Sequence, residues 1–236
     1  MPRTDPSAPP GGGAGFTRDG FRRGVRAALA IAIGLAPFAL VIGVVSDAKG
    51  LSLLETWLMA GLVFAGTSQL VALEIWSDPA PILGATLACL VVNLRLAPMG
   101  AALAPILDRL HGFRLWGTLA LLVDNAFALT IAEIRAGRRD AGFFLGAALA
   151  MWANWMAMVT IGHSFGALVR LPPGHPVFFA ALAALLALLV PIWRGARQDL
   201  LPWAVAGLVA LAAHGGLGLG APWPVLAGAF AGAAAR

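Results

Sequence analysis

The sequence predicts an all-α protein, a polytopic transmembrane bundle of about seven to eight helices with at least one of them broken. Hydrophobic residues make up 60% of the 236 residues and charged residues only 11%, against about 25% in soluble domains. The mean hydropathy of +0.85 points the same way. The apolar runs are continuous, without the alternation of barrel strands, and the abundant Ala and Gly let helices pack closely in lipid.

The chain begins with a segment that is too rich in Pro and Gly to fold. Residues 1–15 are therefore expected to form a disordered tail, and residues 16–236 a single transmembrane transport domain. Two phenylalanines among four arginines at 16–26 are typical of a short interfacial helix over anionic lipid. The apolar run 27–45 is longer than the core of a signal peptide, and no small-residue cleavage site follows it.

Apolar runs of spanning length follow one another along the chain. We expect spans at 26–45, 56–76, 81–105, 115–134, 142–169, 176–193, 200–214 and 221–235. Tryptophans fall near many of their ends, as they do at membrane–water interfaces. The last two runs are short, so residues 200–235 form either two spans or a re-entrant pair.

The distribution of basic residues predicts the orientation. With eight spans and a cytoplasmic N-terminus, eleven basic residues lie inside and four outside, which fits the positive-inside rule. The inside set is Arg3, Arg18, Arg22, Arg23, Arg26, Arg135, Arg138, Arg139, Arg194, Arg197 and Arg236, and the outside set is Lys49, Arg109, Arg114 and Arg170. Since these residues sit in short loops, the net charge of +5 reflects membrane orientation, and no nucleic-acid partner is expected.

Charged and amide side chains at membrane depth are the first part of the candidate site. Asn93 and Arg95 lie near the middle of the apolar run 86–105, and Asp124 and Asn125 lie in the next span. A cation at this depth costs at least ~2.5–3.5 kcal/mol on insertion scales, so it usually faces a polar interior. Arg95 and Asp124 either line a solvated cavity or form a neutralising structural pair, and Asn93 either binds solute or hydrogen-bonds another helix.

The second part of the candidate site is a polar segment near the middle of the second predicted span. It consists of Gly66, Thr67, Ser68 and Gln69. A glycine beside three polar residues can break the helix and free backbone groups to meet a ligand. The alternative is that the Thr67 and Ser68 hydroxyls return hydrogen bonds to their own helix.

Three glycine motifs suggest other roles. Gly142 and Gly146 have the GxxxG spacing of a helix-packing face. The segment 162–166, GHSFG, matches the G-x-S-x-G of serine hydrolases, but that motif needs a strand–turn–helix context, and this one ends an apolar helix. The segment 215–220, GGLGLG, lacks the Lys-Ser/Thr ending of a P-loop. We therefore expect a non-enzymatic protein without catalytic residues, cofactor or metal.

Several of these segments together resemble the AzlC family of branched-chain amino-acid export permeases. The segments that carry the resemblance are 34–38 (GLAPF), 62–69 (LVFAGTSQ), 91–95 (VVNLR) with Met99-Gly100, Asp124 with 127–129 (FAL), and 143–146 (FFLG). The second and third are the more specific. The resemblance runs from about residue 20 to the end of the chain.

The resemblance implies a multi-pass transporter of the inner (plasma) membrane that exports valine, leucine or isoleucine. It also implies a small membrane partner of the AzlD type and transport driven by an ion gradient. Two positions depart from the family, which often has His or Tyr where this chain has Leu96, and an Asp-Glu pair where it has Asp124-Asn125. Coupling or specificity could differ as a result.

These expectations combine into one hypothesis, in which an amino-acid zwitterion binds near the bilayer midplane between the second, third and fourth spans. Arg95, or backbone amides around Gly66 to Gln69, would hold its carboxylate. Asp124 would meet its ammonium group or carry a coupled proton. The alternatives are a non-transporting scaffold subunit and an intramembrane serine hydrolase, whose Ser164 would be followed by Asp199 and His214 in the order of the hydrolase triad.

Overall fold

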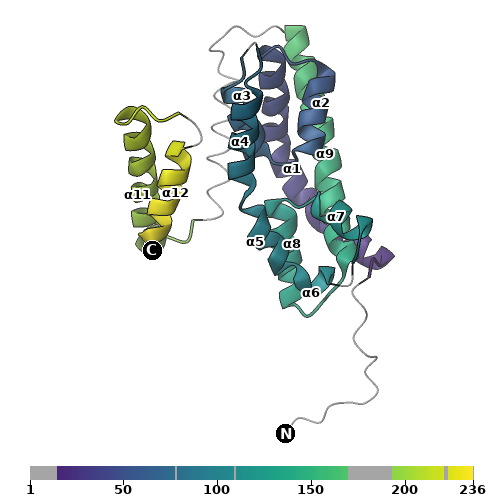
Figure 1. Cartoon of the computed structure of the whole chain (residues 1–236). Coiled ribbons are helices and arrows are strands. Elements are labelled where there is room, and N and C mark those ends of the chain that lie inside the picture. Colours follow the sequence, from purple (N-terminus) through teal and green to yellow (C-terminus); the bar gives the residue numbers. More distant parts are fainter. Residues whose placement is uncertain (1–14, 78, 109, 170–192, 221–222, 236) are drawn as a thin grey trace, which may run out of the picture. The chain divides into compact units, whose positions relative to one another are not determined.

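A computed structural model of the chain describes residues 15–77, 79–108, 110–169, 193–220 and 223–235 (Figure 1). Within these ranges every regular element is a helix, which confirms the all-α prediction. Some predictions fall outside the described residues: the tail at 1–14, nearly all of the predicted span 176–193, and the basic residues Arg3, Arg109, Arg170 and Arg236.

The described part of the chain consists of a succession of helices. They are α1 (Arg18–Ala48), α2 (Leu53–Leu62), α3 (Gly66–Glu74), α4 (Ile82–Asn93), α5 (Leu96–Ala102), α6 (Ala104–Leu107), α7 (Phe113–Leu119), α8 (Asp124–Arg135), α9 (Ala141–Val169), α11 (Ala196–Gly215) and α12 (Trp223–Ala234). The predicted interfacial helix at 16–26 is not separate, because nothing interrupts the backbone ladder between it and the first span, and it forms the first turns of α1.

Three of the described helical segments are long and apolar enough to cross a membrane. They are Arg18–Ala48, Ile82–Ala102 and Ala141–Leu168, and the bent pair α7 and α8 makes a fourth if it is one span. Large apolar side chains such as Ile33, Leu54 and Leu83 are exposed on these and neighbouring helices. Lipid, rather than water, is the solvent that suits such surfaces. The chain is thus a multi-pass helical membrane protein.

The second predicted span is broken at the place that its sequence indicates. Helix α2 ends at Leu62 and α3 begins at Gly66, and Ala65 between them is extended, with φ −148° and ψ 95°. The fourth predicted span is also broken, between Leu119 and Asp124, and its two halves are bent by 114°.

The third predicted span is interrupted between Asn93 and Leu96. Pro98 explains the position, because a proline has no N–H to donate to the carbonyl four residues earlier, which here belongs to Leu94. The result is that Leu94 and Arg95 form a turn between α4 and α5.

The chain divides into two compact units. The first comprises Met1–Ala36 and Arg95–Ala157, and the second comprises Pro37–Leu94 and Met158–Arg236. Helices α1 and α9 contribute one part to each unit.

Glycines bring α1 and α9 into close contact within each unit. In the first unit, a Cβ added at Gly146 would overlap the Phe21 backbone, and one at Gly142 would lie 2.6 Å from the Thr17 carbonyl oxygen. In the second unit, a Cβ at Gly162 would overlap the Leu40 carbonyl. The predicted GxxxG packing face at 142–146 is therefore confirmed. The same close contact at a glycine recurs at Gly162, in a second stretch of α9.

Helices α11 and α12 form an antiparallel pair. A Cβ added at Gly232 would lie 2.7 Å from the Pro202 carbonyl oxygen, and one at Gly228 would lie 2.5 Å from the Ala206 carbonyl oxygen. α11 has 20 residues, the length of a spanning helix, and α12 has 12. An antiparallel pair fits both alternatives for residues 200–235, two spans or a re-entrant pair, so that prediction stays a prediction.

Candidate functional site

The first cluster of the candidate site is an ion pair in the first unit. An Nη2 nitrogen of Arg95 lies 3.0 Å from Oδ2 of Asp124. The two side chains are 41% and 45% exposed, so the protein alone does not enclose them. The sequence predicted a guanidinium and a carboxylate drawn together at membrane depth, and the structure places them in contact.

Helix breaks position both partners of this pair. Arg95 stands in the turn before α5, and Asp124 is the first residue of α8, after extended Val123 with φ −142° and ψ 151°. A carboxylate in the first turn of a helix is stabilised by the helix dipole and by amides that have no intrahelical acceptor. Asn125 follows in the same turn and is half-buried.

The second cluster lies in the second unit, where the start of α3 meets α4. Ser68 is fully buried, and its Oγ donates a hydrogen bond of 2.9 Å to Oδ1 of Asn93. The Cys89 Sγ lies 3.5 Å from the Ser68 carbonyl oxygen and adds a weak contact between the same helices. The Ser68 hydroxyl therefore bonds across to another helix rather than to its own, and Asn93 acts as an interhelical acceptor.

Gln69 ties the second cluster to the helix break. Its side chain is fully buried, and its Nε2 donates to the carbonyl of Val63, the residue that follows the end of α2. Its Oε1 is buried and accepts no hydrogen bond from the described residues. A buried acceptor without a donor costs roughly 1–3 kcal/mol, so a water or a solute donor at this position would be favourable.

The remaining members of the second cluster are half-buried. Gly66 and Thr67 form the first turn of α3. The first amides of a helix have no acceptor within it and point along the axis, which makes this turn suited to a carboxylate.

The two clusters belong to different units, but their residues are close in sequence. Asn93 ends α4, Leu94 follows, and Arg95 begins the turn into α5. The prediction that one substrate contacts both clusters stays a prediction.

A capping box fixes the beginning of the helix that leads to the second cluster. The Ser52 Oγ accepts from the Glu55 amide at 3.2 Å, and a Glu55 carboxylate oxygen accepts from the Ser52 amide at 2.7 Å. These hydrogen bonds from Ser52 lower the pKa of Glu55 below its ordinary value. The start of α2, just before the predicted span 56–76, is thus held by a charged cap.

The hydrolase-like segment does not have the backbone that its motif requires. Residues 162–166 lie within the continuous helix α9. The ring of His163 is buried, and its Nε2 lies 2.9 Å from the Leu51 carbonyl oxygen, where it serves to join two segments of the chain. Asp199 is buried and accepts the Arg194 amide. No turn in this segment would present Ser164 as a nucleophile.

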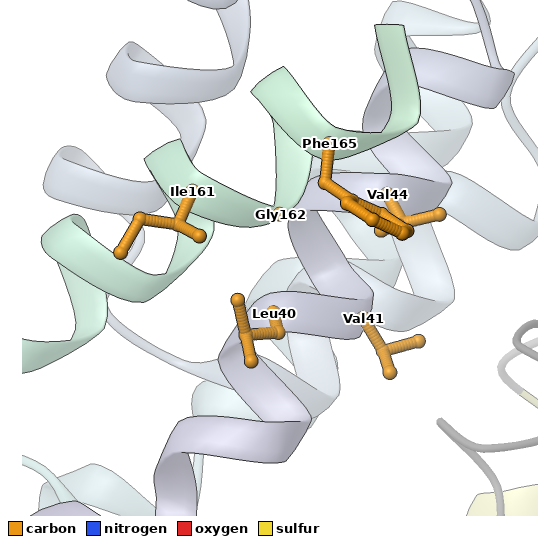
Figure 2. A pocket seen from close by; sticks show the side chains of 6 residues that line it. All are labelled: Leu40, Val41, Val44, Ile161, Gly162 and Phe165. Atoms are coloured by element: carbon orange, nitrogen blue, oxygen red, sulfur yellow. The ribbon is translucent and has the colours of Figure 1, made fainter. Parts of the chain in front are cut away.

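An apolar cavity of about 350 Å³ lies beside α1 and α9 in the second unit. Figure 2 shows that it is lined by Leu40, Val41, Val44, Ile161, Gly162 and Phe165. These side chains offer nothing to orient a charged group, whereas ligand sites combine apolar walls with a few polar contacts. A charged solute would find polar partners in the two clusters and none in this cavity.

Part of this arrangement carried no signal in the sequence. The break between α7 and α8 falls in Ala120-Leu-Leu-Val123, which contains neither Gly nor Pro. The contact from Gln69 to Val63 depends on the conformation of the break itself.

Within the described residues, no group of three or more His, Cys, Asp or Glu side chains could hold a metal ion.

Comparison with known proteins identifies a family. Residues 30–169, more than half of the chain, match the family described as AzlC protein. The chain is similar to the "Inner membrane protein YgaZ" of Escherichia coli (strain K12), with 29% identity over 171 residues that cover 70% of this chain and 68% of the relative.

A second relative comes from an archaeon. It is an "Uncharacterized membrane protein" of Archaeoglobus fulgidus, with 27% identity over 197 residues that cover 82% of this chain and 84% of the relative. No solved structure matches the chain. The family match contains every residue of the two polar clusters, from Gly66 to Asn125.

Proposed function

Because this chain belongs to the AzlC family, we propose that it is a permease that exports branched-chain or other small aliphatic amino acids. The observation that carries this proposal is the contact of 3.0 Å between Arg95 and Asp124. An amino acid carries a carboxylate and an ammonium group, and this pair offers the opposite charge to each.

In the proposed mechanism the substrate exchanges with the ion pair. The carboxylate of the amino acid binds the Arg95 guanidinium, and its ammonium group binds the Asp124 carboxylate. Both protein charges then keep a partner of opposite sign, so the exchange avoids leaving an isolated charge at membrane depth. The exposure of nearly half of each side chain supports access by solute from outside the protein.

The apolar composition of the segments that carry Arg95 and Asp124 supports the choice of an aliphatic substrate. In the same unit, Leu119 and Leu122 form an apolar wall against Gly100 in α5, and a Cβ added at this glycine would lie 3.5 and 3.8 Å from their side chains. A wall of this kind distinguishes one methylene by only ~1–3 kcal/mol. Valine, leucine and isoleucine should therefore compete for the same site.

The second cluster offers another way to hold the carboxylate. The first turn of α3, which begins at Gly66, together with the Gln69 Oε1, which accepts no hydrogen bond from the described residues, could bind a solute that both accepts and donates. If these groups hold the substrate, Asp124 would instead carry the coupled proton. Substitution of Arg95 and of Gln69 separates the two possibilities.

The rest of the proposal concerns the surroundings of the permease. We propose that it lies in the inner membrane with its N-terminus in the cytoplasm. We further propose that it acts with a small membrane partner of the AzlD type and that a proton gradient drives transport. The name of the Escherichia coli relative, an inner membrane protein, supports the choice of membrane, and the excess of arginine on one side of the predicted topology supports the orientation.

Efflux from proteoliposomes tests this function. The purified chain is reconstituted with and without the small partner, the vesicles are loaded with labelled valine, and a pH gradient is imposed. We expect release that unlabelled leucine inhibits and that requires the gradient. Retention of valine under every condition, with folded protein and partner present, would favour the scaffold alternative.

A further inference from the structure

Seven arginines gather at one end of the first unit, where α1 begins and where the loop between α8 and α9 passes. Three carboxylates accompany them, which leaves a net charge of +4. The arginines are Arg18, Arg22, Arg23, Arg26, Arg135, Arg138 and Arg139, and the carboxylates are Asp19, Glu133 and Asp140. We call these ten residues the basic face.

Polar contacts join the two segments of the basic face. The Thr17 amide donates to Oδ1 of Asp140 at 3.3 Å, and the Thr17 hydroxyl donates to the same carboxylate. An Nη2 nitrogen of Arg23 lies 3.8 Å from Oδ2 of Asp140. Gly20 allows this approach, because a Cβ there would overlap the Asp140 carboxylate. The loop is therefore anchored to the first turns of α1.

All three carboxylates are already engaged by arginines of the same face. Asp19 and Asp140 pair with Arg23, and Glu133 pairs with Arg138 at 2.6 Å. The other five arginines are exposed and have no carboxylate within 4.0 Å in the part of the chain that the structure describes. These five are Arg18, Arg22, Arg26, Arg135 and Arg139. Their charges are available to an external anion.

The position of these charges favours one kind of anion. Arg18, Arg22 and Arg26 follow one another at intervals of four residues and form a stripe along α1. The apolar part of the helix, at 27–45, begins directly after the stripe. Phe16 and Phe21 are 39% and 36% exposed beside it. Arginines at the start of a membrane-spanning helix, flanked by exposed phenylalanines, lie at the depth of lipid headgroups.

We propose that the basic face is a binding site for the headgroups of anionic phospholipids. The stripe on α1 and Arg139 in the loop contact phosphate oxygens, and the phenylalanines enter the acyl boundary. The network of Thr17, Arg23 and Asp140 holds the two segments together, so that one lipid or two adjacent lipids meet both. This inference does not depend on the proposed transport function.

A lipid titration of the whole chain tests the site. The full chain in a neutral detergent is titrated with dioleoylphosphatidylglycerol, with dioleoylphosphatidylcholine as the neutral lipid, and native mass spectrometry counts the bound lipids. We expect the anionic lipid to bind more tightly. An arginine near anionic lipid contributes about a fivefold effect, so Arg18→Gln combined with Arg22→Gln should weaken phosphatidylglycerol binding about 25-fold.

A matched variant separates the site from general charge. Arg114→Gln combined with Arg197→Gln removes the same charge from exposed positions outside the basic face, and should change the affinity less than about twofold. Equal weakening in both double variants would overturn the proposal. Arg18→Lys combined with Arg22→Lys should retain most of the affinity, because it keeps the charge.

A competition measurement and a replacement variant complete the test. Inorganic phosphate and glycerol 3-phosphate should not compete with the lipid at equal concentration, and full competition would show an anion site that does not belong to the membrane. If the double variant at Arg18 and Arg22 does not fold, Arg139→Gln takes its place, with an expected loss of about fivefold. No loss in a folded Arg139→Gln protein would contradict the role assigned to the loop.

Discussion

Arg95 and Asp124 are brought to 3.0 Å from each other by two separate interruptions of helical structure. Each lies at the end of a break rather than within a regular helix, and neither is enclosed by the protein. A pair sealed inside the protein would have no access to a solute, whereas here nearly half of each side chain is exposed. This open geometry instead suits a pair that separates to accept a solute.

Neutralising either partner of this pair should stop transport without unfolding the protein. We expect Arg95→Gln and Asp124→Asn each to reduce valine efflux about 10- to 100-fold, the value of a charge-assisted hydrogen bond to substrate. Because both groups are nearly half exposed, the stability should change by only about 1 kcal/mol or less. Efflux from proteoliposomes and thermal unfolding in detergent measure the two effects.

The double variant decides between the two interpretations of the pair. Combining Arg95→Gln with Asp124→Asn removes both charges, so a purely structural pair would be replaced without loss of export. A substrate-binding pair would leave the double variant as inactive as the single ones. Efflux restored to the level of the unmodified protein would contradict the proposed site.

The hydrogen bond from Ser68 to Asn93 should contribute to stability. Ser68→Ala leaves the half-buried Asn93 oxygen without this donor, and we expect a cost of about 1 kcal/mol. Ser46→Ala is the matched control, since Ser46 is also fully buried but donates only to the Ile42 carbonyl in its own helix. Thermal unfolding should show the larger decrease for Ser68→Ala. If both variants lower the unfolding temperature by the same amount, the hydrogen bond between the helices contributes no more to stability than one within a helix.

The sequence predicted those features that depend on local chemistry or on the cost of charge in lipid. The break before Gly66 was expected because glycine stands beside three polar residues, and the pairing of Arg95 with Asp124 because a lone charge is costly there. By contrast, Ala120–Val123 has ordinary apolar composition. Its break depends on how distant segments pack, which no local pattern records.

Close packing between α1 and α9 gives a prediction that concerns stability alone. Gly162→Ala places a methyl group against the Leu40 carbonyl, and such overpacking costs ~1–3 kcal/mol. Gly34→Ala is the control, because nothing lies within 4 Å of the added Cβ and alanine favours the helix by about 0.5–1 kcal/mol. The unfolding temperature should fall for Gly162→Ala and stay or rise for Gly34→Ala. A rise in both would show that this glycine contact does not limit packing.

The capping box at the start of α2 predicts a dependence on pH. The Ser52 hydrogen bonds lower the pKa of Glu55, so the carboxylate form is favoured in the folded protein. A depressed folded pKa contributes stability above the unfolded value of about 4.3, and this contribution is lost as the pH falls through the folded pKa. Hydrogen exchange of the first amides of α2 should therefore be faster in Glu55→Ala than in the unmodified chain at pH 7.

The same comparison at low pH completes the argument. Once Glu55 is protonated, the unmodified chain has lost the charged acceptor that holds the Ser52 amide, so the difference from Glu55→Ala should shrink as the pH falls through the lowered pKa of Glu55. Ser52→Ala provides the control, because it removes the cap from the other side and leaves a carboxylate that still titrates. A difference between Glu55→Ala and the unmodified chain that is equally large at pH 7 and at pH 3 would show that the charge on this carboxylate does not hold the start of the helix.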